Sequence, residues 1–348
     1  MEQSMEDQSD DYPGGPVVGI VYNAKHGAEK GAAPDAEAEY DSPATVAAIQ
    51  EALKAGGYRT VLLEGDGTLA GNLQKTHIDI AFNISEGLRS RGREAEIPAL
   101  LNLLGIPFTG SDETALCIAL DKALTKRLVA TYGIRTPAYA VVESERDIDA
   151  LRLRFPVIVK PNAEGSSKGI PDACVASDEK GLRALLRRGL SLYGEPMLAE
   201  EYISGREFTV GILGNGAGVR VFPPMEIVFR RDTAEHCRVY SYGVKQNYRD
   251  YVGYECPAKL PPESEKAMKD MALGAFRALG CRDFARVDFR MAEDGAVYFI
   301  EINPLPGLAP GYSDYPMLAA FCGVPYEKLV LSVLDSALSR LGMEAVRQ

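Results

Sequence analysis

The sequence predicts an α/β (α+β) fold that is divided among two or three domains. Three observations support this class. Strand and helix patterns alternate in the first third of the chain, two later strand patterns flank an Asp294-Gly295 pair, and 348 residues exceed the length of one typical domain. The composition is 46% hydrophobic and 25% charged, which is typical of a globular protein with a sizeable core.

Charge and residue usage exclude several classes of function. A net charge of -11 argues against nucleic acid or an anionic membrane as the main partner. The apolar runs are too short to cross a bilayer, and the acidic residues 1–16 lack the features of a signal peptide. We therefore expect a cytoplasmic protein with a disordered acidic tail. Six cysteines without a CxxC pair and three scattered histidines predict neither a disulfide framework nor a zinc site.

The first third of the chain predicts a β-α-β unit with a parallel sheet. Three apolar runs predict its strands: PVVGIVYN (16–23), YRTVLLE (58–64) and IDIAFNI (78–84). After the first run, Asp41 or Ser42 is expected to cap a helix that has Pro43 in its first turn. The segment GDGTLAG (65–71) does not match the dinucleotide pattern GxGxxG, so we expect a plain loop there. Ligands of such a sheet bind at the carboxyl ends of its strands.

The polar residues of the two later strands fall at spacings that a purely structural hairpin does not require. If Asp294-Gly295 forms a two-residue loop, counting outward places Asp288 opposite Glu301 and Arg286 opposite Asn303. Side chains alternate with period two along a strand. All four side chains are therefore expected on one face of the hairpin.

An oxygen-rich face of this kind predicts a cation site. Two carboxylates opposed at roughly 5 Å repel by a few kcal/mol at an effective dielectric near 20. An Asp, Glu and Asn set suits a hard cation, most naturally Mg²⁺ shared with a polyphosphate. Two alternatives remain open: a solvated polar face on an edge hairpin, or a carboxylate simply paired with Arg286.

A second polar cluster predicts an anion site. The strand pattern FPVIVKP ends on Lys160, and the segment EGSSKG (164–169) follows it. Consecutive backbone N–H groups and the hydroxyls of Ser166 and Ser167 would form a nest for phosphate, with Lys168 adding charge. A serine-rich hairpin turn explains the same segment without a ligand.

Other charged residues allow two interpretations each. Glu200, Glu201 and Glu207 lie in apolar surroundings and need donors, which a ribose, an adenine amino group or a salt bridge to Arg206 would supply. The region from Asp112 to Tyr132 has a helical pattern. Its cations are Lys122, Lys126 and Arg127, and any one of them could lie on a solvated face. A tyrosine-rich stretch, 231–256, could be a lid or an edge strand.

The order of these motifs resembles that of the D-alanine:D-alanine ligase family of the ATP-grasp superfamily, from about Val17 onward. The segments that carry the resemblance are FTGS (108–111), LDKALTK (120–126), VIVKPNAEGSSKG (157–169), EYISGREFTV (201–210), CPA (256–258), LGCRDFARVDFR (279–290) and EINPLPGL (301–308). The resemblance implies an ATP-grasp fold with three α/β domains. These would be a Rossmann-like pre-ATP-grasp domain (17–110), a central lid domain (111–205) and a C-terminal catalytic domain (206–348), with ATP between the last two.

The resemblance also implies a role for individual residues. ATP would be contacted by Lys122, Lys160, Ser166, Ser167, Glu200, Glu201, Ile203 and Glu207. Mg²⁺, expected as two ions with Mn²⁺ as a possible substitute, would be held by Asp288, Glu301 and Asn303. Catalysis would use Arg286, the backbone N–H of Gly307, and Lys245 at the γ-phosphate. A homodimer is expected because relatives are commonly dimers.

The implied reaction joins two amino-acid-like substrates in two steps. One substrate's carboxylate attacks the γ-phosphorus of ATP to give an acyl phosphate and ADP. The amine of the second substrate then displaces phosphate through a tetrahedral intermediate. Arg286 and the N–H of Gly307 would form the oxyanion hole of that intermediate. No side-chain nucleophile is required, in agreement with the lack of a Ser/His/Asp arrangement.

The sequence departs from the family where the substrates should bind. Glu86-Gly87 replaces the family's His-Gly, and Gln246 replaces an aromatic residue of the lid. Tyr312-Ser313 aligns with the family's Ser-Leu, and Asp314 adds negative charge where the second substrate's carboxylate should bind. Either Glu39 or Asp41 would hold the first amino group.

These departures predict substrates other than D-alanine. The arginines of the first domain suggest an additional anionic group on a substrate, although they could simply solvate a loop: Arg89, Arg91 and Arg93. Three alternatives remain open. These are a genuine D-alanine:D-alanine ligase of peptidoglycan synthesis, a non-catalytic nucleotide-binding module, and a kinase that forms an acyl phosphate without an amine acceptor.

Overall fold

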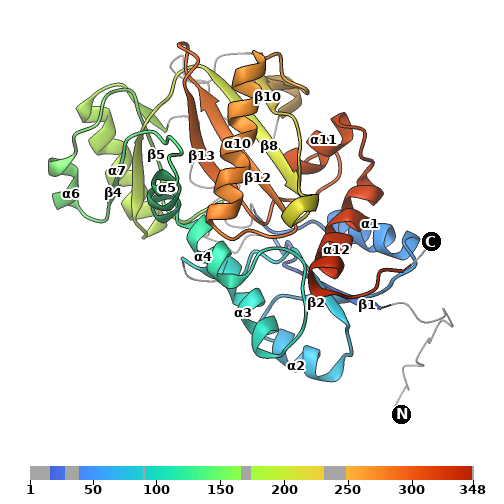
Figure 1. The fold of residues 1–348 in the computed structure, drawn as a ribbon. Coiled ribbons are helices and arrows are strands. Elements are labelled where there is room, and N and C mark those ends of the chain that lie inside the picture. Colours follow the sequence, from blue (N-terminus) through green and yellow to red (C-terminus); the bar gives the residue numbers. More distant parts are fainter. Residues whose placement is uncertain (1–15, 28–38, 89–90, 166–173, 231–247, 347–348) are drawn as a thin grey trace.

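The computed structural model describes residues 16–27, 39–88, 91–165, 174–230 and 248–346, and it contains three separate β-sheets (Figure 1). Each sheet falls within one of the three residue ranges predicted as domains. The domain boundaries near residues 110 and 205 remain a prediction.

The first sheet has the order β2-β1-β3, and both of its pairings are parallel. Its elements are β1 (Val17–Tyr22), α1 (Pro43–Ala55), β2 (Arg59–Glu64), α2 (Leu69–Lys75), β3 (Ile80–Asn83), η1 (Arg93–Ala95) and α3 (Glu96–Leu103). The predicted helix start is confirmed, because the Ser42 side chain accepts a hydrogen bond from the Thr45 N–H at 3.1 Å and Pro43 is the first helical residue. The expectation of a plain loop at 65–71 is wrong in part. Helix α2 begins inside that segment and buries Leu69 and Leu73, which are one turn apart.

The second sheet has the order β4-β7-β5-β6, and all of its pairings are antiparallel. Its elements are β4 (Tyr139–Val142), α6 (Glu145–Ala150), β5 (Val157–Pro161), β6 (Val175–Ala176), α7 (Glu179–Tyr193) and β7 (Met197–Glu201). Helix α7 packs on this sheet through Leu182, Leu186 and Gly189. Gly189 has a packing reason, since an added Cβ would lie 2.5 Å from the Met197 side chain.

The third sheet has the order β11-β10-β8-β12-β13, with β9 on β8, and helix α10 packs against it (Figure 1). Its elements are β8 (Arg206–Leu213), η2 (Gly216–Gly218), β9 (Arg220–Val221), β10 (Met225–Phe229), α9 (Tyr248–Tyr251), β11 (Val252–Glu255), α10 (Pro262–Ala278), β12 (Phe284–Met291) and β13 (Val297–Asn303). Strands β7 and β8 belong to different sheets and are separated by residues 202–205, which include Gly205. Gly205 has φ +130°, and a Cβ there would lie 2.2 Å from the Met291 carbonyl oxygen.

The helical pattern between Asp112 and Tyr132 is divided into two helices, α4 (Glu113–Leu120) and α5 (Lys122–Thr131). Asp121 divides them, because its side chain caps α5 by accepting hydrogen bonds from the Leu124 N–H at 3.0 Å and from Asn162 Nδ2 at 2.8 Å. Lys122 is therefore the first residue of α5. Both Lys122 and Lys126 are buried, so the alternative of a solvated helix face is wrong for these two lysines.

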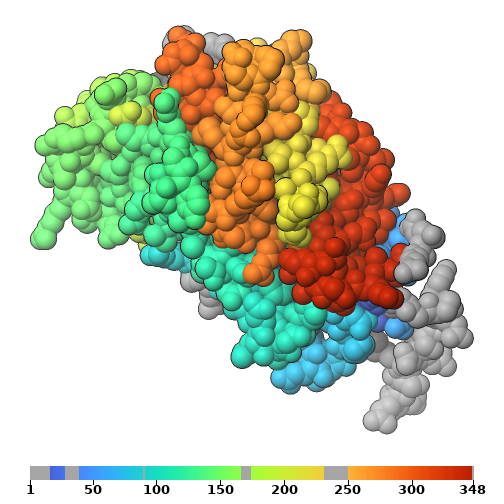
Figure 2. All heavy atoms as spheres, in the orientation of Figure 1, coloured from blue at the N-terminus to red at the C-terminus, as the bar shows by residue number. Residues whose placement is uncertain are grey.

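The largest apolar core joins the two ends of the chain. It packs β1, β3 and α1 against α11 (Asp314–Phe321) and α12 (Tyr326–Leu341). In Figure 2 the C-terminal helices, in red, lie directly against the N-terminal region, in blue and cyan. No single helix in the described ranges is long and apolar enough to cross a membrane. Helices α11 and α12 pass that test only as a pair, and the pair is bent by 106°.

One buried carboxylate connects the first sheet, the third sheet and α12. Asp283 is fully buried, and its side chain accepts hydrogen bonds from the Gly110 N–H at 2.8 Å, from Asn215 Nδ2 at 2.7 Å and from the Arg340 guanidinium at 2.8 and 3.0 Å. Arg340 also donates to the Phe108 carbonyl at 2.9 Å. Removing this charge should therefore weaken the contact between the N- and C-terminal parts of the chain.

We predict that Asp283→Asn lowers the free energy of unfolding by about 3 kcal/mol, the typical cost of removing one partner of a buried ion pair. Asn tolerates the left-handed backbone of this position, φ +64°, so the variant isolates the loss of charge. Denaturant titration measures the change. The matched control is Asp294→Asn at the exposed hairpin tip. Equal stability of the two variants would show that Asp283 is not a tertiary link.

Candidate active site

The hairpin of β12 and β13 has the predicted outer register. Arg286 pairs with Asn303 and Asp288 pairs with Glu301, so the four polar side chains share one face of the sheet. This part of the prediction is confirmed.

The predicted two-residue loop is wrong. Phe289 pairs with Phe299 and Met291 with Val297, so the turn spans residues 292–296. A β-bulge with the extra residue Ile300 then shifts the pairing by one residue and restores the predicted partners further out. The bulge also has a structural use, since Lys126 Nζ donates to the Ile300 carbonyl at 3.2 Å.

The Asp288 carboxylate is paired with Arg286. The guanidinium donates to both oxygens of Asp288, at 3.0 and 2.9 Å, and Asn303 Nδ2 donates to one of them at 3.2 Å. Arg286 also lies 3.8 Å from Asp314. Burial opposes the charge of Arg286, but Asp288 and Asp314 outweigh it and raise the pKa of the guanidinium. The predicted alternative, in which a carboxylate of the hairpin pairs with Arg286, is therefore observed for Asp288.

The opposing carboxylate of Glu301 has a separate cation. Its oxygen lies 3.8 Å from Lys122 Nζ, which also donates to the Glu164 carbonyl. Burial favours the neutral carboxyl group, but Lys122, Lys160 and Arg286 together lower the pKa of Glu301. Glu301 is therefore ionised at neutral pH, as a metal ligand must be.

A buried ionic network lies beside this face. Glu200 is paired with Lys160 at 3.3 Å and more closely with Lys126, and all three side chains are nearly inaccessible to solvent. Burial raises the pKa of Glu200, but the two lysines outweigh it and lower the pKa. Lys126 was not among the predicted site residues. Its position one helical turn after Lys122 was the one sequence feature that pointed to it.

The remaining described residues predicted at the nucleotide each have contacts of their own. Glu207 accepts a hydrogen bond from Arg290 at 2.9 Å, and burial raises the pKa of Glu207 to about 7. Glu201 accepts from the Arg154 N–H at 3.0 Å, and Ile203 is half-buried. The predicted alternative of a salt bridge to Arg206 is wrong for these carboxylates, because Arg206 pairs with Glu226 at 2.7 Å.

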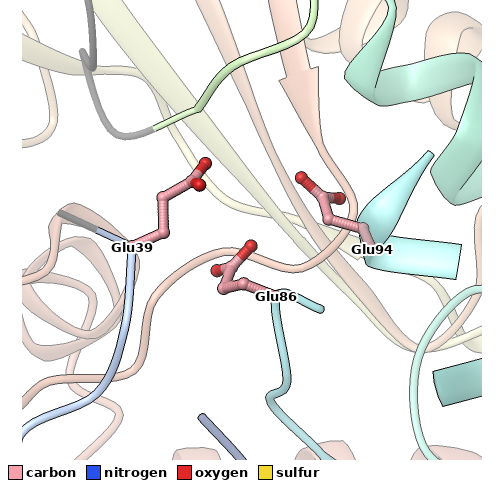
Figure 3. A group of neighbouring side chains, drawn as sticks. All are labelled: Glu39, Glu86 and Glu94. Carbon is pink, nitrogen blue, oxygen red and sulfur yellow. The ribbon is translucent and has the colours of Figure 1, made fainter. Parts of the chain in front are cut away.

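A cavity of about 400 Å³ joins the face of the hairpin to the first domain. Residues that are far apart in the sequence line it, among them Glu39, Glu86, Glu94, Lys122, Arg286 and Gly307. Figure 3 shows the side chains of Glu39, Glu86 and Glu94 pointing toward a common space. A cation and a backbone N–H in one cavity can together stabilise an oxyanion. Arg286 and Gly307 both line this cavity.

Glu39 is held by Arg93 within the cavity wall. The Arg93 guanidinium donates to both oxygens of Glu39, at 2.8 and 2.6 Å, and to the Ala163 carbonyl at 2.8 Å, and it lies 3.1 Å from Glu164. Arg91 is exposed and lies 3.4 Å from Asp121. The expectation that Arg91 and Arg93 bind an extra anionic group is therefore wrong for Arg93, whose donors are already used; Arg89 lies outside the described residues.

The segment before α11 forms the far wall of the cavity. Ser313 is the N-cap residue of α11, and its Oγ accepts a hydrogen bond from the Ala309 N–H at 3.2 Å. An added Cβ at Gly307 would lie 2.8 Å from that oxygen, so glycine is required for this close approach. Tyr312 lines the same wall. Four predicted site residues lie outside the described ranges, namely Ser166, Ser167, Lys245 and Gln246.

The donors on the hairpin face fit a hard cation. Asp288, Glu301 and Asn303 offer only oxygen ligands on one face, and Mg²⁺ prefers such a set. Thr209, the partner of Asp288 on β8, adds a buried hydroxyl that has no hydrogen-bond partner among the described residues. Lys122 and Lys160 supply positive charge beside this face, as a polyphosphate requires.

Solved structures with a similar architecture show which fold the chain has. A D-alanine–D-alanine ligase from Bacillus anthracis complexed with ATP matches with a TM-score of 0.71 and 24% identity, covering 93% of this chain and 98% of that one. A D-Ala:D-Ser ligase from Enterococcus faecalis matches with a TM-score of 0.72 and 19% identity, covering 93% and 100%. The chain therefore has the ATP-grasp fold of these ligases.

Sequence relatives identify the family. A family model described as the D-ala D-ala ligase C-terminus matches residues 128–335. D-alanine–D-alanine ligases of Cupriavidus necator and Bordetella petrii are 34% and 33% identical, covering 79% and 84% of this chain and 86% of each relative. An uncharacterised protein of Sinorhizobium fredii is 33% identical and covers 85% of this chain and 86% of its own length. The chain belongs to the D-alanine–D-alanine ligase family.

We predict that Glu200→Gln lowers the free energy of unfolding by about 3–5 kcal/mol, because it leaves the ammonium groups of Lys126 and Lys160 buried without a carboxylate. Lys126→Met should cost less, since Glu200 then retains Lys160. Denaturant titration of both variants measures the order, with Glu179→Gln in an exposed ion pair as the control. A larger loss for Lys126→Met would contradict the network as described.

Proposed function

We propose that the protein is an ATP-dependent carboxylate-amine ligase that joins two D-alanine molecules. The observation that carries the proposal is the internal neutralisation of the charges that had argued for other substrates. Asp314 is buried 3.8 Å from Arg286, and the Arg93 guanidinium is divided between Glu39 and Glu164. Neither residue presents an uncompensated charge to a substrate, so the family's own substrates become the better choice.

The chemistry that we propose proceeds through an acyl phosphate. The carboxylate of the first substrate attacks the γ-phosphorus of ATP, the P–O bond to ADP breaks, and an acyl phosphate forms. The amine of the second substrate then attacks the carbonyl carbon. The C–N bond forms, the C–O bond to phosphate breaks, and the amine releases its proton. No atom of the protein enters a covalent bond in either step.

Residues of the cavity would act on charge in both steps. Lys122 and Lys160 would neutralise the phosphates, and Arg286 with the N–H of Gly307 would stabilise the oxyanion. Asp288, Glu301 and Asn303 would hold Mg²⁺, which would supply positive charge to neutralise the γ-phosphate. Arg286 would have to leave Asp288 at least in part to serve the oxyanion, and a cation held by Asp288 would favour that release.

Three finer parts of the proposal come from the resemblance: two Mg²⁺ ions bind per active site, Mn²⁺ replaces Mg²⁺, and the protein is a homodimer. The proposed cytoplasmic location comes from the sequence composition. Metal titration with each ion tests the first two. Light scattering after gel filtration tests the dimer.

A second candidate function keeps the chemistry but uses amino acids other than D-alanine. Glu86 favours it, because this residue introduces a carboxyl group where the family has histidine. The solved structure of a D-Ala:D-Ser ligase supports variation of the second substrate within this fold.

We predict ADP release with D-alanine as the sole amino acid, and a loss of about 100-fold or more in kcat/KM for Asp288→Asn, because that change removes a metal ligand. A coupled assay of ADP, with mass analysis of the dipeptide, measures both. Asp294→Asn on the same hairpin is the matched control and should retain full activity.

The outcomes separate the competing functions. Turnover with other amino acids but not with D-alanine would favour the second candidate. ADP formation without a dipeptide would indicate a kinase, and nucleotide binding without any turnover would indicate a binding module. Full activity of Asp288→Asn would contradict the proposed metal site.

A further inference from the structure

Two thiols that the chemistry described so far does not use lie close together beside the third sheet. Cys256 directly follows β11, at one end of the strand order of that sheet, and Cys322 is the C-cap residue of α11. Their sulfur atoms are 3.8 Å apart, within hydrogen-bond distance for sulfur. Both residues are half-buried, whereas the other described cysteines are either exposed or buried. A small solute can therefore reach this pair.

Hydrogen bonds hold the backbone on both sides of the pair. Strand β11 pairs with β10, and shortly after it the Ala258 N–H donates to the Pro224 carbonyl at 2.9 Å. At the end of α11 the Cys322 N–H donates to the carbonyls of Leu318 and Ala319, at 3.1 and 3.0 Å. The sulfur atoms of a disulfide lie about 2.05 Å apart. Bond formation therefore requires the sulfurs to approach by about 1.8 Å, through side-chain rotation and a small shift of α11.

Helix α11 connects the two thiols to the active-site cavity. The opposite end of this helix begins at its N-cap Ser313, whose Oγ leaves no room for a side chain at Gly307. Its first residue, Asp314, lies 3.8 Å from Arg286. The helix has eight residues, and its backbone hydrogen bonds pass a shift of one end to the other. A change at Cys322 would therefore move the wall of the cavity.

The environment of Cys256 decides the order in which the two thiols would react. Burial, followed by the charge of Cys322 and the hydrogen bond to it, raises the pKa of Cys256 to about 12. Cys256 is therefore protonated at neutral pH, which leaves the first attack on an oxidant to Cys322. Once Cys322 is part of a mixed disulfide it carries no charge. Two of the three causes that raise the pKa of Cys256 are then removed, and Cys256 becomes more reactive.

We propose that Cys256 and Cys322 form a reversible disulfide that acts as a redox switch of the active site. The inference rests on the proposed ligase function, to which it adds a means of regulation. In the oxidised protein α11 is displaced, the cavity wall at Ser313 no longer fits the amino-acid substrate, and turnover falls. A reversible bond suits the proposed cytoplasmic location, where thiols stay reduced until an oxidant is present.

The oxidant is a small-molecule disulfide such as oxidised glutathione. The Cys322 thiolate attacks one of its sulfurs, a mixed disulfide forms, and one glutathione thiolate leaves. Cys256 then releases its proton, its sulfur attacks Cys322 Sγ, and the second glutathione thiolate leaves. The protein loses two electrons and two protons, and the oxidant is reduced to two thiols. An excess of a dithiol reverses both steps.

The first test locates the bond. The protein is incubated with oxidised glutathione, its remaining thiols are blocked, and it is digested without reduction for mass spectrometry. A peptide pair joined through Cys256 and Cys322 is expected. The melting temperature should also rise, because the bond closes a loop between residues 66 positions apart and so restricts the unfolded chain.

Single variants control this test. Cys256→Ser and Cys322→Ser should each lose the bond and the rise in melting temperature. Cys117→Ser, at an exposed cysteine, and Cys237→Ser, outside the described residues, should keep both. No bond between Cys256 and Cys322, or a bond from either of them to Cys237, would overturn the proposal.

The second test is kinetic. In the oxidised protein kcat/KM for D-alanine should fall about 10-fold or more, because small displacements of a substrate-binding wall lower rates by factors of this size. The KM of ATP should stay within about twofold, and dithiothreitol should restore the full rate. Cys322→Ser should have the activity of the reduced wild type with or without the oxidant. An unchanged kcat/KM in wild type that carries the mapped bond would contradict the switch.

A measurement without turnover separates this proposal from the proposed function. Amide hydrogen exchange of residues 305–323 should slow at least about threefold on oxidation of the wild type, and should not change in Cys322→Ser. If the reduced protein does not turn over D-alanine, the proposed ligation of D-alanine fails. The mapped bond together with slower exchange would in that case support the switch, and exchange that is unchanged by the bond would reject it.

Discussion

The pairing of Arg286 with Asp288 on one hairpin face is the interaction on which the rest of the site depends. It is made possible by the β12–β13 register, which the bulge at Ile300 sets. The pair compensates two partly buried charges. A metal ion bound by Asp288 would weaken its pairing with Arg286, and Arg286 could then contact the oxyanion. The register of the two strands would in this way connect metal binding to catalysis.

Buried charged side chains elsewhere in the molecule are also paired with an opposite charge. Asp283 has Arg340, Glu200 has two lysines, and Glu39 has Arg93. Buried charges without partners would destabilise the fold by several kcal/mol each. Glu86 and Glu94 share a cavity with the cationic side chains of Lys122 and Arg286.

Much of the fold and of the hairpin site was predictable, because strand alternation fixes which side chains share a face. The predicted length of the β12–β13 loop was wrong, because a count of alternating residues cannot show a bulge. The outer partners were predicted correctly, because the bulge compensated for the longer turn. Burial of Lys126 depended on the break between α4 and α5 and on the distant Glu200, which local pattern does not encode. The Arg93–Glu39 pair likewise joins segments 54 residues apart. Local sequence patterns do not show such a pairing, so Arg93 and Glu39 were each predicted to contact a substrate.

A crystal structure of the protein with Mg²⁺ and a non-hydrolysable ATP analogue tests the central claim most directly. The account predicts metal density between Asp288, Glu301 and Asn303, and an Arg286 guanidinium that has moved away from at least one oxygen of Asp288. An Arg286–Asp288 pair unchanged from its 2.9 and 3.0 Å contacts, with the metal bound elsewhere, would contradict it.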